Sequence, residues 1–225
     1  MKLDIPEILK ALAKNRPVFH SEADFQHSLA WQIREMHPGL HPRLEYPFER
    51  SENKACDVVL FQGGKMVMAI ELKYPCQKLK YENKGEVFNL KYNSAPDSAR
   101  HGTLKDIERM EKLLKEARKN KKRTTQASVI TLTNDSVLWK GPKKGNVVDA
   151  EFNIAEFITQ RNKRVENVVT GKLKWASKTS RNTERMYGNV KLFGSYKMKW
   201  QEYSRVEGKF GRFRYLHIPV QPPKS

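Results

Sequence analysis

The sequence predicts an α/β fold in which helices flank a central sheet, followed by a basic part rich in antiparallel strands. Three observations predict it: an apolar hairpin pattern at residues 54–75, a helical and then a strand pattern over residues 103–133, and alternating runs separated by Gly, Ser and Asn from residue 161. We therefore expect a core over residues 1–160 and a basic antiparallel β-rich part over residues 161–225 that packs on it.

Two helices and a strand are expected before the hairpin. Residues 4–15 have helical periodicity, with Pro6 in the first turn. A second helix follows Ser21, whose hydroxyl can cap it. Its apolar face comprises Phe25, Leu29, Ile33 and Met36. A strand over residues 44–48 then leads into the hairpin.

The hairpin combines apolar strands with embedded charge. Gly63-Gly64 separates the two strands and suits a tight turn, because glycine adopts positive φ without steric cost. Asp57 opens the first strand, and Glu71 and Lys73 close the second on a shared face. If the strands pair around the glycines, Asp57 lies near the other two. The pattern also fits an ordinary surface hairpin in which Lys73 pairs with Glu71 in solvent.

A divalent cation would stabilise such a cluster. Two carboxylates about 4 Å apart repel each other by roughly 4 kcal/mol at an effective dielectric constant near 20. Mg²⁺ prefers carboxylate oxygens and would remove this repulsion. The Lys73 ammonium beside it could assist a metal-bound water or stabilise charge on a phosphate.

After the hairpin, residues 76–103 are polar and predict a loop or a small insertion, with a strand near residues 86–91. A helix is expected over residues 103–119, capped by Thr103, and a short buried strand over residues 127–133. Strand, helix and strand in this order indicate a βαβ crossover onto the central sheet. A further short helix is expected over residues 151–160.

Composition favours a soluble, cytoplasmic nucleic-acid-binding protein. The 225 residues carry 43 Lys and Arg against 25 Asp and Glu, a net charge of +18. This surplus attracts polyanions. Membrane surfaces are the rival partner, but neither an amphipathic basic helix nor a membrane-spanning apolar run is visible. The start of the chain lacks a signal-peptide pattern. Cys56 and Cys76 fit two reduced thiols.

The C-terminal part contributes most of the charge. Alternating runs at residues 172–177, 189–200 and 209–220 predict antiparallel strands with bases on one face and apolar groups on the other. A solubilising face and a DNA-contacting face both fit this pattern, and the scarcity of acids favours the second. The candidate DNA contacts, with two residues that follow the hairpin, are Gln77, Lys78, Lys172, Lys174, Lys197, Lys199, Arg212 and Arg214.

Asp57 is followed, after thirteen residues, by Glu71-Leu72-Lys73 on an apolar strand. This motif resembles that of the PD-(D/E)xK nuclease superfamily. The resemblance covers roughly residues 20–135 and implies a restriction-endonuclease-like mixed central sheet flanked by helices. It implies that Asp57 and Glu71 bind Mg²⁺ and that Lys73 serves the hydrolytic water. Many members add a Glu from an early helix, which here corresponds to Glu22. Cys56 stands where the family name has proline.

The resemblance implies a metal-dependent DNA endonuclease of restriction or mobile-element type. Mg²⁺ is the expected cofactor, and Mn²⁺ is expected to substitute for it. DNA is the expected partner, and a homodimer would suit double-strand cutting. Glu22 also fits a first-turn acid that only stabilises its helix dipole. The alternative function is a non-catalytic DNA- or RNA-binding protein with a nuclease-like fold.

Overall fold

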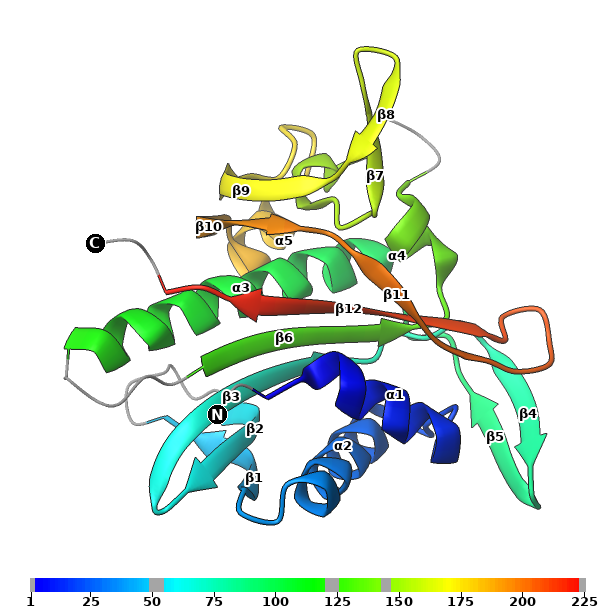
Figure 1. The fold of residues 1–225 in the computed structure, drawn as a ribbon. Helices are drawn as coiled ribbons and strands as arrows, with labels where there is room; N and C mark the ends of the chain where they lie inside the picture. Colours follow the sequence, from blue (N-terminus) through cyan, green and yellow to red (C-terminus); the bar gives the residue numbers. More distant parts are fainter. Residues whose placement is uncertain (1–2, 49–54, 120–125, 143–146, 223–225) are drawn as a thin grey trace.

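A six-stranded mixed sheet forms the centre of the computed structural model, which describes residues 3–48, 55–119, 126–142 and 147–222 (Figure 1). The strand order is β1-β2-β3-β6-β12-β11, and only β3 and β6 are parallel neighbours. The strands span β1 (His41–Pro47), β2 (Ala55–Gln62), β3 (Lys65–Lys73), β6 (Gln126–Thr133), β11 (Trp200–Arg205) and β12 (Arg212–Val220).

The predicted hairpin is confirmed as β2 and β3. Gly63 and Gly64 form its turn with φ of 56° and 72°, values that favour glycine. The predicted crossover is also confirmed: β3 leads through helix α3 (Pro96–Lys119) to β6, with which it pairs in parallel. This arrangement makes the fold α/β with a mixed sheet.

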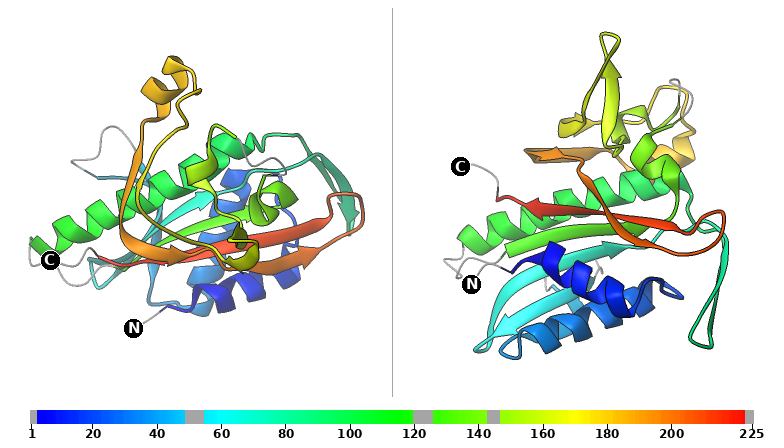
Figure 2. Two further views of the ribbon diagram at one scale, coloured as in Figure 1. Left: turned by 90° about the horizontal axis from the view of Figure 1, so that it is seen from above. Right: turned by 45° about the vertical axis from the view of Figure 1, so that its right-hand side comes forward.

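Helices α1 (Ile5–Asn15) and α2 (Glu22–Met36) cover one face of the sheet (Figures 1 and 2). The Ser21 hydroxyl caps α2 by accepting a hydrogen bond from the Asp24 N–H. Phe25, Leu29 and Ile33 are fully buried in one core cluster with residues of β2 and β3. Both predicted helices and the predicted cap are confirmed, and the cap fixes the position of the first turn of α2.

Helix α3 covers the opposite face and begins earlier than expected. It starts at Pro96, so the prediction that Thr103 caps it is wrong. The Thr103 hydroxyl instead donates to the Ala99 carbonyl within the helix and lies 2.9 Å from the Thr131 hydroxyl of β6. Proline suits a first turn because it has no N–H to leave unpaired. The buried stripe of α3 thereby begins one turn earlier.

Two short segments differ from expectation. Residues 76–95 contain a hairpin, β4 (Leu79–Asn83) with β5 (Glu86–Leu90), which confirms the strand near residue 86 and adds its partner. The helix expected over residues 151–160 is wrong. The segment forms a 3-10 turn (Ala150–Phe152) and then strand β7 (Phe157–Gln160), which pairs with β8 (Lys163–Glu166). Helix α4 (Ser136–Lys140) precedes it.

The C-terminal part is antiparallel, as predicted, and is tied to α3. Strand β9 (Val168–Leu173) pairs with β10 (Val190–Lys197), and α5 (Arg181–Tyr187) lies between them in sequence. The buried Glu111 carboxylate of α3 accepts hydrogen bonds from the N–H groups of Phe193 and Gly194. Strands β11 and β12 join the central sheet, which therefore draws strands from both sides of residue 160. Among the described residues, no helix is long and apolar enough to cross a membrane.

Candidate active site

Four predicted residues are placed around the carboxyl end of β3. Asp57 comes from β2, Glu71 and Lys73 from β3, and Glu22 from the first turn of α2. The Leu72 N–H donates to Asp57 Oδ2 at 2.5 Å. The Tyr74 N–H donates to Glu22 Oε2 at 2.7 Å. The two carboxylates thus bind the N–H groups of Leu72 and Tyr74, the residues before and after Lys73.

The backbone of β2 and β3 explains the position of Asp57. The paired residues of these strands end at Val58 and Ile70. Beyond that pair, the Leu72 N–H of β3 donates its hydrogen bond to the Asp57 side chain instead of to the backbone of β2. On its other side, Gln26 of α2 donates to the Asp57 carbonyl at 2.7 Å. Asp57 is therefore fixed between the strand end and α2.

Helix α3 adds two charged residues that the sequence analysis did not identify. Asp106 Oδ2 lies 2.9 Å from Lys73 Nζ. Arg109 forms an ion pair with Glu71, and its guanidinium also donates to the Ala55 carbonyl at 3.1 Å. Asp106 lies four residues before the buried Met110, one helical turn away on the same side of α3, so the available signal was an acid at helical spacing from an apolar core residue.

The cluster is buried at one end and open at the other. The Glu71 side chain is 1% exposed, whereas the Lys73 side chain is 30% exposed. Asp57 is half-buried and Glu22 is exposed. A substrate could therefore reach Glu22, Asp57 and Lys73 from solvent, while Glu71 forms the floor of the site.

Four carboxylates in this cluster face two cations. Although Glu22 is exposed as a whole residue, desolvation of its carboxylate by the surrounding protein raises its pKa, as it does for Asp57, and burial raises the pKa of Glu71 to about 8. Burial alone would lower the pKa of Lys73, but the carboxylates of Asp106 and Glu22 outweigh it and raise that pKa. Lys73 is therefore an ammonium at neutral pH, and the acids of the cluster outnumber its cations.

The pKa of Glu71 predicts that stability in EDTA falls as pH rises. Its pKa is about 8 in the fold against an ordinary value of 4.5, so between these values the folded state holds a proton that the unfolded state has released. Linkage then lowers the free energy of unfolding by up to about 1.4 kcal/mol per pH unit across this window. Urea unfolding from pH 5 to pH 8 measures it. Glu71→Gln should flatten the slope, and Glu116→Gln, an exposed acid on α3, should not. Equal slopes for all three proteins would contradict the prediction.

The donor set fits a hard divalent cation in its chemistry. Glu22, Asp57 and Glu71 supply carboxylate oxygens, which Mg²⁺ prefers. Both oxygens of Glu71 are buried, and neither accepts a hydrogen bond of ordinary geometry within the described part of the chain. In the described residues, however, no three His, Cys, Asp or Glu side chains are grouped so that they could hold one ion. At Glu71 the Arg109 guanidinium takes the place of a cation.

The predicted DNA contacts divide into two groups. Lys78, Lys172, Lys174, Lys197 and Lys199 are exposed, and Lys197 pairs with Glu166 at 2.8 Å. The others bond within the fold. Gln77 Nε2 donates to Asp135 at 3.1 Å, Arg212 pairs with Glu202, and the half-buried Arg214 donates to Glu156 and to the Trp200 carbonyl. Of these candidates, Lys78, Lys172, Lys174 and Lys199 are thus the most available to reach a phosphate backbone, while Lys197 would have to leave Glu166.

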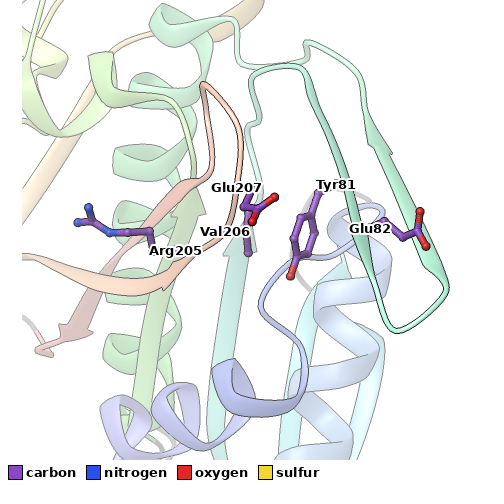
Figure 3. Close-up of a pocket in the computed structure, with 5 residues that line it drawn as sticks. All are labelled: Tyr81, Glu82, Arg205, Val206 and Glu207. Atoms are coloured by element: carbon purple, nitrogen blue, oxygen red, sulfur yellow. The ribbon is translucent and has the colours of Figure 1, made fainter.

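A separate hollow lies between the β4–β5 hairpin and the loop from β11 to β12 (Figure 3). It encloses about 530 Å³ and is lined by Tyr81, Glu82, Arg205, Val206 and Glu207. These residues include none of the predicted site residues. The hollow is therefore distinct from the charged cluster at the end of β3.

Cys56 lies beside the cluster, where the sequence resemblance has proline. Its thiol lies 3.4 Å from the Ile70 carbonyl, and burial, with the nearby Glu71 carboxylate, raises its pKa far above the ordinary value. The side chain is thus an uncharged, buried group that packs against the floor of the site. Comparisons of the chain with protein families, with curated proteins and with solved structures find no match.

Proposed function

We propose that this protein is a Mg²⁺-dependent deoxyribonuclease that hydrolyses phosphodiester bonds, an endonuclease of restriction or mobile-element type. The observation that carries the proposal is the convergence of the motif residues. Asp57 and Glu22 accept hydrogen bonds from the N–H groups of Leu72 and Tyr74, the residues on either side of Lys73. Glu71 lies on the same strand as Lys73, two residues earlier. A hairpin followed by a helix and a parallel strand supports a restriction-endonuclease-like core.

In this proposal Glu22, Asp57 and Glu71 would have to draw together to hold the ion, which would displace Arg109 from Glu71, and Mn²⁺ could replace Mg²⁺. A bound ion would activate water and withdraw charge from the scissile phosphate. Lys73 Nζ is held by Asp106 at 2.9 Å and by the Leu72 carbonyl at 3.1 Å. Because its pKa is raised, the amine acts as a cation and a hydrogen-bond donor toward phosphate oxygens rather than as a base.

DNA is the favoured substrate because of the charge. The net charge is +18, and exposed lysines lie on β9 (Lys172) and on β10 (Lys191 and Lys197), with Lys174 and Lys199 just beyond the ends of these strands. Neutralising phosphates with such side chains releases counterions and gives salt-sensitive binding. A homodimer would place two such sites on one duplex for double-strand cutting.

Plasmid cleavage tests the proposal. The purified protein should nick or linearise supercoiled plasmid with Mg²⁺ or Mn²⁺ and lose this activity in EDTA. Asp57→Asn and Glu71→Gln should abolish cleavage but keep DNA affinity, because each removes a carboxylate without changing side-chain size. Glu116→Gln is the matched control, since this acid is exposed on α3 away from the cluster. Gel analysis of plasmid forms, with anisotropy for binding, measures both quantities.

The alternative is a non-catalytic DNA- or RNA-binding protein. The ion pair between Arg109 and Glu71 favours it, because the floor of the site is already neutralised from within the chain. Under this alternative the wild type binds DNA or RNA but cleaves nothing with any divalent ion. Wild-type cleavage that Asp57→Asn does not alter would instead point to a contaminating nuclease.

A further inference from the structure

The β7–β8 hairpin stands apart from the rest of the fold. Figures 1 and 2 both show it projecting from the body, at the far side from α1 and α2. Its two strands pair with each other and with no other strand of the described chain. The core does not require this projection, because the tip residues 159–164 are exposed.

The tip of this hairpin is strongly basic. Residues 160–164 read Gln-Arg-Asn-Lys-Arg and contain no apolar side chain and no acid. Glu166, the acid of β8, lies at the base of the hairpin and pairs with Lys197 at 2.8 Å. Arg161 and Lys163 form no ion pair within the described residues. Three cations are thus presented together at the end of a narrow ribbon.

The ribbon presents its cations on more than one side. Thr159 pairs with Arg164, and Gln160 pairs with Lys163, so Lys163 and Arg164 lie on opposite faces. Arg161 and Asn162 form the turn with positive φ, so Arg161 lies at the end of the ribbon, beyond the last strand pair. The Arg164 guanidinium lies 4.0 Å from the centre of the Phe157 ring, which orders the side chain along one face of the ribbon, toward its base.

We infer that the β7–β8 hairpin enters the major groove of duplex DNA. The major groove, about 12 Å wide, admits a two-stranded ribbon. Cations on both faces then meet the phosphates of both groove walls, while Arg161 reaches the base edges, where arginine pairs with guanine. The exposed lysines of β9 and β10 next to the hairpin contact the adjoining phosphates. This inference rests on the proposed function only in taking DNA as the polyanion.

Two other polyanions fit the hairpin less well. Single strands are held on exposed aromatic platforms, whereas the Phe157 ring of this hairpin is covered by Arg164. Membrane-docking elements insert apolar side chains below the headgroups, and the tip has none. Duplex DNA is the polyanion whose shape and charge both match the ribbon.

The test compares two triple variants in EDTA, so that metal and cleavage play no part. Arg161→Ala/Lys163→Ala/Arg164→Ala removes the tip cations. Lys10→Ala/Lys14→Ala/Lys65→Ala removes three exposed cations from α1 and the β2–β3 turn, and is the matched control. The tip variant should reduce the salt slope of duplex affinity by about 1.8, for the two phosphate contacts of Lys163 and Arg164, and weaken binding at least tenfold near 0.1 M salt. The control should change neither.

Dimethyl sulfate footprinting provides a second measurement. Protection of guanine N7 reports the major groove, and it should be present with wild type and absent with the tip variant. Equal salt slopes for the two variants, or equal losses on single-stranded DNA or anionic vesicles, would overturn the inference. A tip-dependent affinity in a protein that never cleaves plasmid would leave the inference standing and reject the nuclease.

Discussion

Lys73→Ala is expected to slow DNA cleavage by about 10²–10³-fold while duplex affinity stays unchanged. Lys73 Nζ is fixed by Asp106 and by the Leu72 carbonyl, and its side chain is 30% exposed at the open side of the cluster. A fixed ammonium at this place can stabilise charge that builds up on the phosphate in the transition state. Single-turnover cleavage measures the rate, and anisotropy in EDTA measures the affinity.

Asp106 makes this prediction more specific. Asp106→Asn keeps the Lys73 amine but removes the charge that orients it, so a smaller loss in rate is expected, with substrate affinity unchanged. Lys73→Arg should not restore the rate, because a planar guanidinium cannot replace the compact ammonium beside Gly102, where α3 passes close to Lys73 Cε. Lys112→Ala, an exposed lysine of the same helix, is the control. A Lys73→Ala protein that cleaves like wild type would exclude this role.

The placement of the motif residues could be predicted because it depends on local rules. Alternation along β3 puts Glu71 and Lys73 on one face, and a glycine turn brings Asp57 of β2 to the same end. The Ser21 cap fixes the first turn of α2 and hence Glu22. Each of these steps involves neighbours in sequence or one tight turn, so hydrophobic pattern and turn chemistry determine them.

The contribution of α3 could not be predicted in the same way. Asp106 and Arg109 reach the cluster only because α3 crosses β3 in one particular rotation, which is set by core packing over many residues. The helix expected at residues 151–160 failed for a related reason. Glu156 pairs there with Arg214 of β12, and Asn167 donates to the Asn153 and Ala155 carbonyls, so distant residues fix the backbone. Local propensity is overridden by such contacts.

Asp149→Ala is expected to destabilise the fold by about 3–5 kcal/mol. Asp149 accepts a hydrogen bond from Arg100 Nε at 2.5 Å, and the two side chains are 2% and 5% exposed. Removing the carboxylate leaves the guanidinium buried without its counter-charge. Because Arg100 lies in α3 and Asp149 directly precedes the 3-10 turn, the pair joins the two segments. A fall in melting temperature of about 10 °C is expected for a chain of this size.

A double variant can show whether the loss of stability comes from the unpaired charge of Arg100 or from the missing contact itself. If the uncompensated charge causes the destabilisation, Arg100→Met/Asp149→Leu should recover most of the stability, because apolar groups can fill the same buried space. Lys197→Ala breaks the exposed pair with Glu166 and should leave the melting temperature unchanged, since solvent screens that pair. If the double variant were as unstable as Asp149→Ala, the unpaired charge could not be the cause. The pair would then act through its geometry, by orienting the segment that carries β9 and β10. Cleavage by the double variant would then report whether that orientation also matters for the residues that α3 supplies to the site.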